Sequence, residues 1–210
     1  MVGLLVGLWT GVPLDAINGL LMGCSVVLVF LGSWIVQEVP RTRIFQPFRL
    51  STLQITTTAV FSGLTAALTS LLLVPSPTGG YTSIGDVMVF VAALLFGSRV
   101  GGLSGAIGAV TADLYTGYDR WFLSIPAHGL EGIIAGFARG RRISVQVVSL
   151  AIAGFVMASV YFYVNIFIRG LPVALISYAR DLFGQAGISL ILSVIVARSV
   201  QRTLQGHSPR

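Results

Sequence analysis

A small number of polar and charged side chains interrupts a mostly apolar chain. Two of them, His128 and Glu131, are three residues apart and would share one face of a helix. A charge in an apolar helix costs on the order of 3 kcal/mol in a membrane, so such groups usually pair or line a wet cavity. Carboxylates beside aromatic rings suit a neutral or cationic heterocycle better than a polyanion. The candidate binding residues are Tyr81, Asp86, Asp113, Tyr118, His128, Glu131, Asn165 and Arg180.

The same charges also admit a purely structural interpretation. Arg180 could form an internal salt bridge with Glu131 or Asp113 that only holds helices together. Ser83 and Asp86 have the spacing of a capping box at the start of an apolar helix, a role that does not exclude contact with a ligand. A shared cavity is favoured because four predicted helices carry these residues at the same depth and on the same side.

No catalytic, metal or cofactor site is predicted. The sequence GLSG at 102–105 matches the Gly-x-Ser-Gly pattern of intramembrane serine proteases. We expect Ser104 and His128 near opposite ends of their helices, far beyond the roughly 3 Å that a nucleophile and its base require. One embedded histidine and a single cysteine give poor support for a metal site. The chain has no lysine and therefore no P-loop, so any ATP must be hydrolysed by another subunit.

The composition indicates an integral membrane protein. Hydrophobic residues make up 55% of the 210 residues, charged residues 10%, and the mean hydropathy is +0.90. The stretches 16–37, 50–85 and 143–168 carry no charge, and each is long enough to cross about 30 Å of hydrocarbon as a helix. Lipid is therefore the expected surrounding, and the positive net charge of +6 is attributed to membrane orientation rather than to nucleic-acid binding.

Apolar runs separated by turn residues predict seven helices. One at 14–37 precedes a basic connector, and six follow at 53–74, 84–96, 101–115, 125–138, 144–168 and 172–200. We expect an all-α integral membrane protein, a six-helix bundle with one extra N-terminal transmembrane helix. The predicted units are the N-terminal helix and connector at 1–48, the binding domain at 49–202 and a cytoplasmic tail at 203–210.

The thirteen basic residues, all arginines, are distributed unevenly between the two sets of predicted connections. Only Arg120, Arg169 and Arg180 lie on one side. Because cytoplasmic loops carry an excess of basic residues, we expect a multi-pass cell-membrane protein with a cytoplasmic C-terminus and an extracellular N-terminus. The loops 75–83, 116–124 and 169–171 would then be external, and the candidate site would face outward.

A stripe of small residues lies on the first of the six helices. Ala59, Gly63 and Ala67 recur every four residues and would share one face. Small residues let helices approach closely in lipid, so the stripe predicts either packing within the chain or a docking face for a partner protein. Packing within the chain is what we expect for the glycine pairs Gly101/Gly105 and Gly132/Gly136.

Four ordered motifs resemble a known family. They are GYTSIGD at 80–86, LLFGSRVGG at 94–102, DLYTGY at 113–118 and GLEGIIAG at 129–136. Together they resemble the substrate-binding S component of energy-coupling factor (ECF) vitamin transporters, in the branch that includes riboflavin, hydroxymethylpyrimidine and pyridoxine relatives. The resemblance covers about residues 53–201.

The resemblance implies an S-component bundle that binds a vitamin or precursor near its extracellular face. It also implies an ECF transmembrane coupling subunit, contacted by the small-residue stripe, and two cytoplasmic ATPase subunits. Tyr81, Asp86, Asp113, Tyr118, Glu131, Asn165 and Arg180 would be the matching site residues. Two alternatives are a self-sufficient secondary transporter, with Asp113 and Glu131 relaying protons or cations, and an intramembrane hydrolase built on Ser104.

Overall fold

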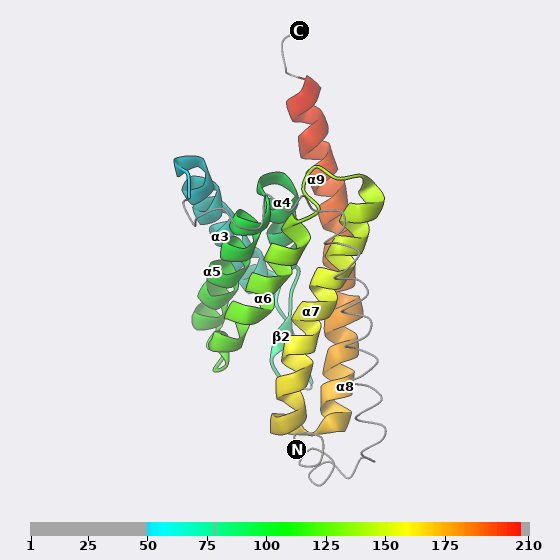
Figure 1. The fold of residues 1–210 in the computed structure, drawn as a ribbon. Helices are drawn as coiled ribbons and strands as arrows, with labels where there is room; N and C mark the ends of the chain where they lie inside the picture. Colours follow the sequence, from blue (N-terminus) through cyan, green and yellow to red (C-terminus); the bar gives the residue numbers. More distant parts are fainter. Residues whose placement is uncertain (1–49, 78, 207–210) are drawn as a thin grey trace.

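The computed structural model describes residues 50–77 and 79–206, which form a bundle of six helical segments (Figure 1). These segments lie where the sequence predicts the six helices of the binding domain, whereas the helix predicted at 14–37 falls outside the described residues. In chain order they are α3 (Thr52–Leu71), α4 (Asp86–Phe96), α5 (Ser98–Thr116), α6 (Trp121–Gly136), α7 (Ile143–Arg169) and a last continuous helix formed by α8 (Leu171–Ala179), η2 (Arg180–Gly187) and α9 (Ile188–Gly206).

Helices α3 and α4 begin in different ways. Ser51 and Gln54 form a capping box, because the Ser51 side chain accepts a hydrogen bond from the Gln54 amide and the Gln54 side chain accepts one from the Ser51 amide. The capping box predicted for Ser83 and Asp86 is wrong. Helix α4 begins at Asp86 itself, and the Ser83 hydroxyl accepts a hydrogen bond from the Gly85 amide at 3.3 Å instead. The Asp86 carboxylate is therefore left for other partners.

Glycines bring α4, α5 and α6 unusually close together. Gly97 has a φ of 92°, so the chain reverses between α4 and α5 within a single residue. A Cβ atom on Gly101 would lie 2.7 Å from the Gly132 carbonyl oxygen, and a Cβ on Gly136 would meet the backbone of Ser98. The prediction that the glycine pairs of α5 and α6 pack within the chain is confirmed.

The apolar core lies between α4, α6, α7 and α9. It is centred on Phe90, Leu94, Leu150 and Ala153, all of which are almost completely buried. Large apolar side chains also cover the outside of the bundle, and Phe183 is 74% exposed. Two described helices, Ile143–Arg169 and Leu171–Thr203, are long and apolar enough to cross a membrane, with mean hydropathies of 2.1 and 1.6.

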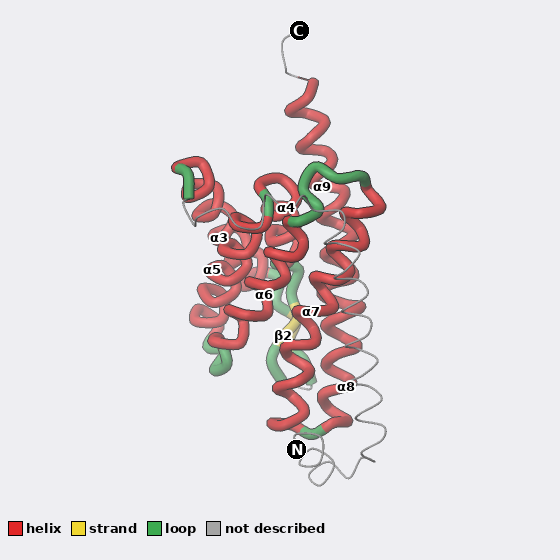
Figure 2. The backbone as a smooth tube through the Cα atoms, viewed as in Figure 1, coloured by secondary structure: helices red, strands yellow, loops and turns green. Residues whose placement is uncertain are grey.

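The connections divide between two ends of the bundle (Figure 2). The α4–α5 turn, the α6–α7 connection and the end of α9 lie at one end, together with Arg99, Arg139 and their neighbours. The α5–α6 and α7–α8 turns lie at the other end, with Arg120 and Arg169.

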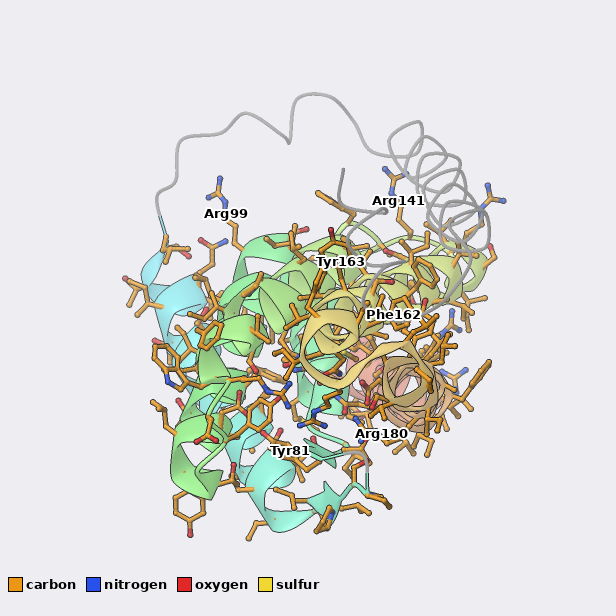
Figure 3. All side chains as sticks on the ribbon, turned by 90° about the horizontal axis from the view of Figure 1, so that it is seen from below. Tyr81, Arg99, Arg141, Phe162, Tyr163 and Arg180 are labelled. Atoms are coloured by element: carbon orange, nitrogen blue, oxygen red, sulfur yellow. The ribbon has the colours of Figure 1, made fainter. Side chains whose placement is uncertain are left out.

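Between α3 and α4 the chain forms a short antiparallel hairpin. In it β1 (Val74–Pro75) pairs with β2 (Tyr81–Thr82), with Pro75 opposite Tyr81. The second strand lies against η2, the π-helical segment of the last helix. In the view along the bundle, Tyr81 and Arg180 accordingly come from neighbouring elements (Figure 3). Because π-helical turns occur often at functional sites, the junction between the hairpin and η2 is a candidate functional site.

Candidate functional site

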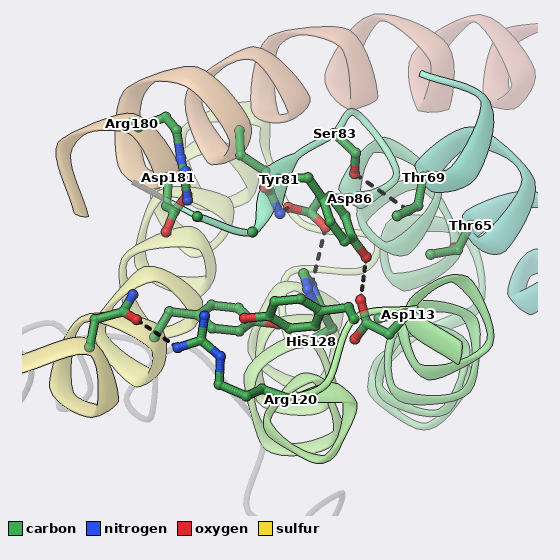
Figure 4. Close-up of a pocket in the computed structure, with 17 residues that line it drawn as sticks. Thr65, Thr69, Tyr81, Ser83, Asp86, Asp113, Arg120, His128, Arg180 and Asp181 are labelled. Atoms are coloured by element: carbon green, nitrogen blue, oxygen red, sulfur yellow. Dashed lines mark hydrogen bonds and ion pairs between the residues drawn. The ribbon is translucent and has the colours of Figure 1, made fainter. Parts of the chain in front are cut away.

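A polar cavity opens beside the hairpin and η2 (Figure 4). It takes in about 600 Å³ of space, part of it open to solvent. Its walls come from α3, the hairpin loop, α4, α5, the α5–α6 loop, α6, α7 and η2. Seven of the eight predicted binding residues line it: Tyr81, Asp86, Asp113, Tyr118, His128, Asn165 and Arg180.

The eighth residue, Glu131, does not line the cavity. It is completely buried, and its Oε2 atom lies 2.8 Å from Nδ1 of His128, which does line the cavity. The same ring nitrogen lies 3.1 Å from Oδ1 of Asp86. Two carboxylates therefore lie against the Nδ1 edge of the imidazole, and Glu131 acts on the cavity through the position of His128 rather than by direct contact.

Asp86 also connects the base of the cavity to the last helix. The Gln185 amide donates a hydrogen bond to Asp86 at 2.8 Å, and its oxygen accepts one from the Thr82 hydroxyl at 3.1 Å. Asp86 is 2% exposed, so this network is shielded from bulk water. It joins α4, the hairpin and η2, and it fixes the direction in which the Asp86 carboxylate faces.

A second network surrounds Asp113. The hydroxyl groups of Tyr81 and Ser124 each donate a hydrogen bond to one of its carboxylate oxygens, and Ser124 is 2.7 Å from the Tyr161 hydroxyl. Burial, followed by the hydrogen bond to Asp113, raises the pKa of the Tyr81 hydroxyl in the hairpin above its ordinary value. Tyr81 therefore remains a proton donor and holds the hairpin against α5. The ring of Tyr118 packs edge-on against Tyr81, with centroids 5.7 Å apart.

Cationic groups lie toward the mouth of the cavity. Arg120 donates a hydrogen bond to the Asn165 side chain at 3.0 Å, and its guanidinium carbon is 5.3 Å from the centre of the Tyr118 ring. Arg180 binds the neighbouring Asp181 at 2.7 Å. The alternative of a salt bridge to Glu131 or Asp113 is not supported in the described part of the chain, where Glu131 binds His128 and Asp113 accepts hydrogen bonds from Tyr81 and Ser124.

The residues at the base also have a spacing that could suit a metal ion. One ligand atom from each of Asp86, His128 and Glu131 lies within 4.8 Å of the others. A hydrogen bond of 2.8 Å from Glu131 and an ion-pair contact of 3.1 Å from Asp86, both to Nδ1 of the imidazole, account for the same arrangement. We therefore read the group as a hydrogen-bonded triad, and the expectation that the chain lacks a metal site stays a prediction.

The structure corrects one argument against a hydrolase. Ser104 and His128 are not far apart along the bundle, because Gly105 contacts the backbone carbonyl of His128. The side chains nevertheless have other partners. The Ser104 hydroxyl faces the Thr58 carbonyl at 3.5 Å, and Nδ1 of His128 lies against Asp86 and Glu131. A Ser–His pair is absent for this reason rather than because of separation.

The small-residue stripe lies on the outside of the described bundle. Ala59, Gly63 and Ala67 are exposed, and a Cβ atom on Gly63 would meet no atom within 4 Å. The opposite face of α3 carries the buried residues Thr58, Ser62, Thr65 and Thr69, which face the other helices. Within the described residues, the stripe therefore does not serve packing inside the chain.

Several cavity residues were not among the predicted set. Gln185 follows Asp181 by one helical turn, and this spacing is the signal that could have found it. Ser124 does not line the cavity but hydrogen-bonds to Asp113, and it gave no signal, because an isolated serine near the start of an apolar helix is common. Arg120 had a signal, since it is one of only three arginines at its end of the bundle.

A bundle of helices around a polar cavity is suited to bind a small solute. The family described as the S component of ECF-type riboflavin transporters matches residues 49–204. The chain belongs to this family, whose members are membrane-embedded transporter subunits.

Individual relatives agree with this assignment. A thiamine precursor transporter, HmpT of Lactococcus lactis subsp. cremoris, is 26% identical over 155 residues, which cover 71% of this chain and 89% of HmpT. A Pyrococcus woesei protein of uncharacterised function is 41% identical over 75 residues, or 34% of this chain, and the match spans half of that protein. The solved S component of a bacterial ECF transporter superimposes with a TM-score of 0.58 at 18% identity, covering 72% of this chain and 97% of that one. This last likeness shows the shared fold.

Proposed function

We propose that this chain captures a small water-soluble vitamin or vitamin precursor at the extracellular face of the cell membrane. It would deliver the ligand together with an ECF transmembrane coupling subunit and two cytoplasmic ATPase subunits. The observation that carries the proposal is the cavity, where side chains from eight segments of the chain supply carboxylates, hydroxyls and aromatic rings around one space. The riboflavin description of the family and the thiamine-precursor description of HmpT support a vitamin-like heterocycle as the ligand.

The proposed orientation places the cavity outside. The described arginines concentrate at the end of the bundle opposite the cavity, and a basic excess marks the cytoplasmic side. The C-terminus would then be cytoplasmic. The hairpin loop with Gly79 and Gly80, whose φ angles are 80° and 75°, would form the outer cover of the site.

Ligand retention and reconstituted uptake test this function. We expect protein purified in detergent to retain a vitamin-like heterocycle that mass spectrometry identifies. Vesicles containing this chain alone should show no uptake under a proton or sodium gradient, whereas addition of a coupling subunit and ATPases should give ATP-dependent uptake. Gradient-driven uptake by the chain alone would contradict the proposal and favour a secondary transporter that uses Asp113 and Glu131.

The exposed stripe on α3 is proposed as the docking face for the coupling subunit. Replacing Gly63 with leucine should lower ATP-dependent uptake by about tenfold or more, because a large side chain prevents close helix approach. Ligand affinity of the isolated protein should not change, since Gly63 faces away from the cavity. Gly63→Ala is the matched control. Normal uptake by Gly63→Leu would show that the coupling subunit docks elsewhere.

A further inference from the structure

The cavity is electrically polarised from its base to its mouth. Asp86 and Asp113 are each 2% exposed and form the inner end, with His128 at 7%. Arg120 and Arg180, which also line the cavity, are only partly buried. A ligand that fills this space therefore meets hydrogen-bond acceptors at one end and cationic donors at the other.

Arg120 is a partly buried cation that lines the cavity near its mouth. Among the described residues it forms no ion pair with a carboxylate, whereas Arg180 is bound to Asp181. A guanidinium group has five N–H donors, and only the hydrogen bond to Asn165 engages one of them. The guanidinium carbon of Arg120 also lies over the ring of Tyr118, and this contact restrains the group. Arg120 is thus fixed in place with most of its donors unused.

A second guanidinium adds positive charge near the same opening. A Cβ atom on Gly79 would lie within 2.7 Å of the central carbon of the Arg169 guanidinium, so that group lies directly against the hairpin loop. Gly79 is itself part of the cavity wall. The mouth therefore has the field and the donor geometry that favour an anionic group, because guanidinium groups bind phosphate through paired hydrogen bonds.

We propose that Arg120 determines specificity by binding a phosphate monoester on the ligand. The ligand would be a phosphorylated heterocycle whose N–H donor edge faces Asp86 and Asp113 and whose phosphate lies at the mouth. The preference for a neutral or cationic heterocycle, inferred from sequence, then describes the inner end alone. This inference rests on the proposed capture of a vitamin-like ligand and specifies the chemical class of that ligand.

Three matched pairs of compounds test the proposal on the full-length protein in detergent. They are riboflavin and flavin mononucleotide, pyridoxine and pyridoxine 5′-phosphate, and hydroxymethylpyrimidine and its phosphate. In at least one pair, calorimetry should show that the phosphorylated member binds about tenfold or more tightly than the neutral one. Arg120→Gln should remove this difference while leaving the affinity for the neutral member in place. Arg120→Lys should retain part of the difference, and Arg202→Gln, at the far end of the bundle, all of it.

The possible outcomes separate this proposal from the general function. Equal or tighter binding of the neutral member in every pair would overturn the phosphate assignment while supporting capture of a vitamin-like ligand. A loss of affinity for both members of a pair in Arg120→Gln would also overturn it, because Arg120 would then serve the fold or the ring. Failure of all six compounds to bind would overturn the phosphate assignment, whereas the vitamin function is judged separately by the ligand retained on purification and by ATP-dependent uptake.

Discussion

Replacing Asp86 with alanine is expected to lower ligand affinity by about hundredfold or more. The carboxylate lines the base of the cavity, accepts a hydrogen bond from Gln185 at 2.8 Å and lies 3.1 Å from Nδ1 of His128. Alanine removes the acceptor that faces the ligand and leaves the buried Gln185 amide without an acceptor, and both losses add to the cost of binding. Calorimetry with riboflavin, hydroxymethylpyrimidine or pyridoxine, whichever the wild-type protein binds, provides the measurement.

Two further variants show whether the effect belongs to the site. Asp119→Ala removes an exposed carboxylate from the nearby α5–α6 loop and should leave affinity unchanged. Glu131→Ala should lower affinity less than Asp86→Ala, by about tenfold, because Glu131 holds His128 and does not line the cavity. If Asp86→Ala and Glu131→Ala both bind as well as Asp119→Ala, the cavity is not the binding site. Thermal unfolding of each variant separates loss of binding from loss of fold.

The sequence predicted the helices well because apolar length and turn residues are local signals. All six described helical segments were expected, as was the separation of arginines between the ends. The gathering of seven predicted residues around one cavity also follows from local signals. Polar groups are costly in apolar helices, so those placed at similar depths on neighbouring helices tend to face one shared wet space.

What the sequence could not provide was the pairing of side chains. Arg180 binds Asp181, its neighbour in the chain, and Glu131 lies behind His128 instead of in the cavity. Both outcomes depend on how η2 and α6 are rotated, which side-chain spacing does not fix. The distance between Ser104 and His128 was misjudged for a related reason. Close packing through Gly105 places the two helices in a register that the turn between them does not reveal.

A second large effect is expected on stability when the contact between α5 and α6 is disturbed. Replacing Gly132 with alanine should lower the free energy of unfolding by about 1–3 kcal/mol. A Cβ atom on Gly132 would meet the carbonyl group of Gly101 and lie 2.6 Å from the Gly102 amide nitrogen, all of which is backbone that cannot rotate away. The helices would have to separate, and because α6 also carries His128 and Glu131, the base of the cavity would shift with them. Thermal unfolding in detergent should show a melting temperature lower by about 5 °C or more.

Gly63→Ala is the matched control for the Gly132→Ala experiment. Both substitutions add one methyl group to a helical glycine, and alanine favours a helix by as much as about 1 kcal/mol. At Gly63 the new methyl group meets no atom within 4 Å, so the stability should stay the same or rise. At Gly132 the same gain is outweighed by the backbone clash. The changes in the free energy of unfolding should therefore have opposite signs in the two variants. Equal melting temperatures for the two variants would show that α5 and α6 are not in backbone contact. The register that aligns His128 with Asp86 would then lose its structural basis.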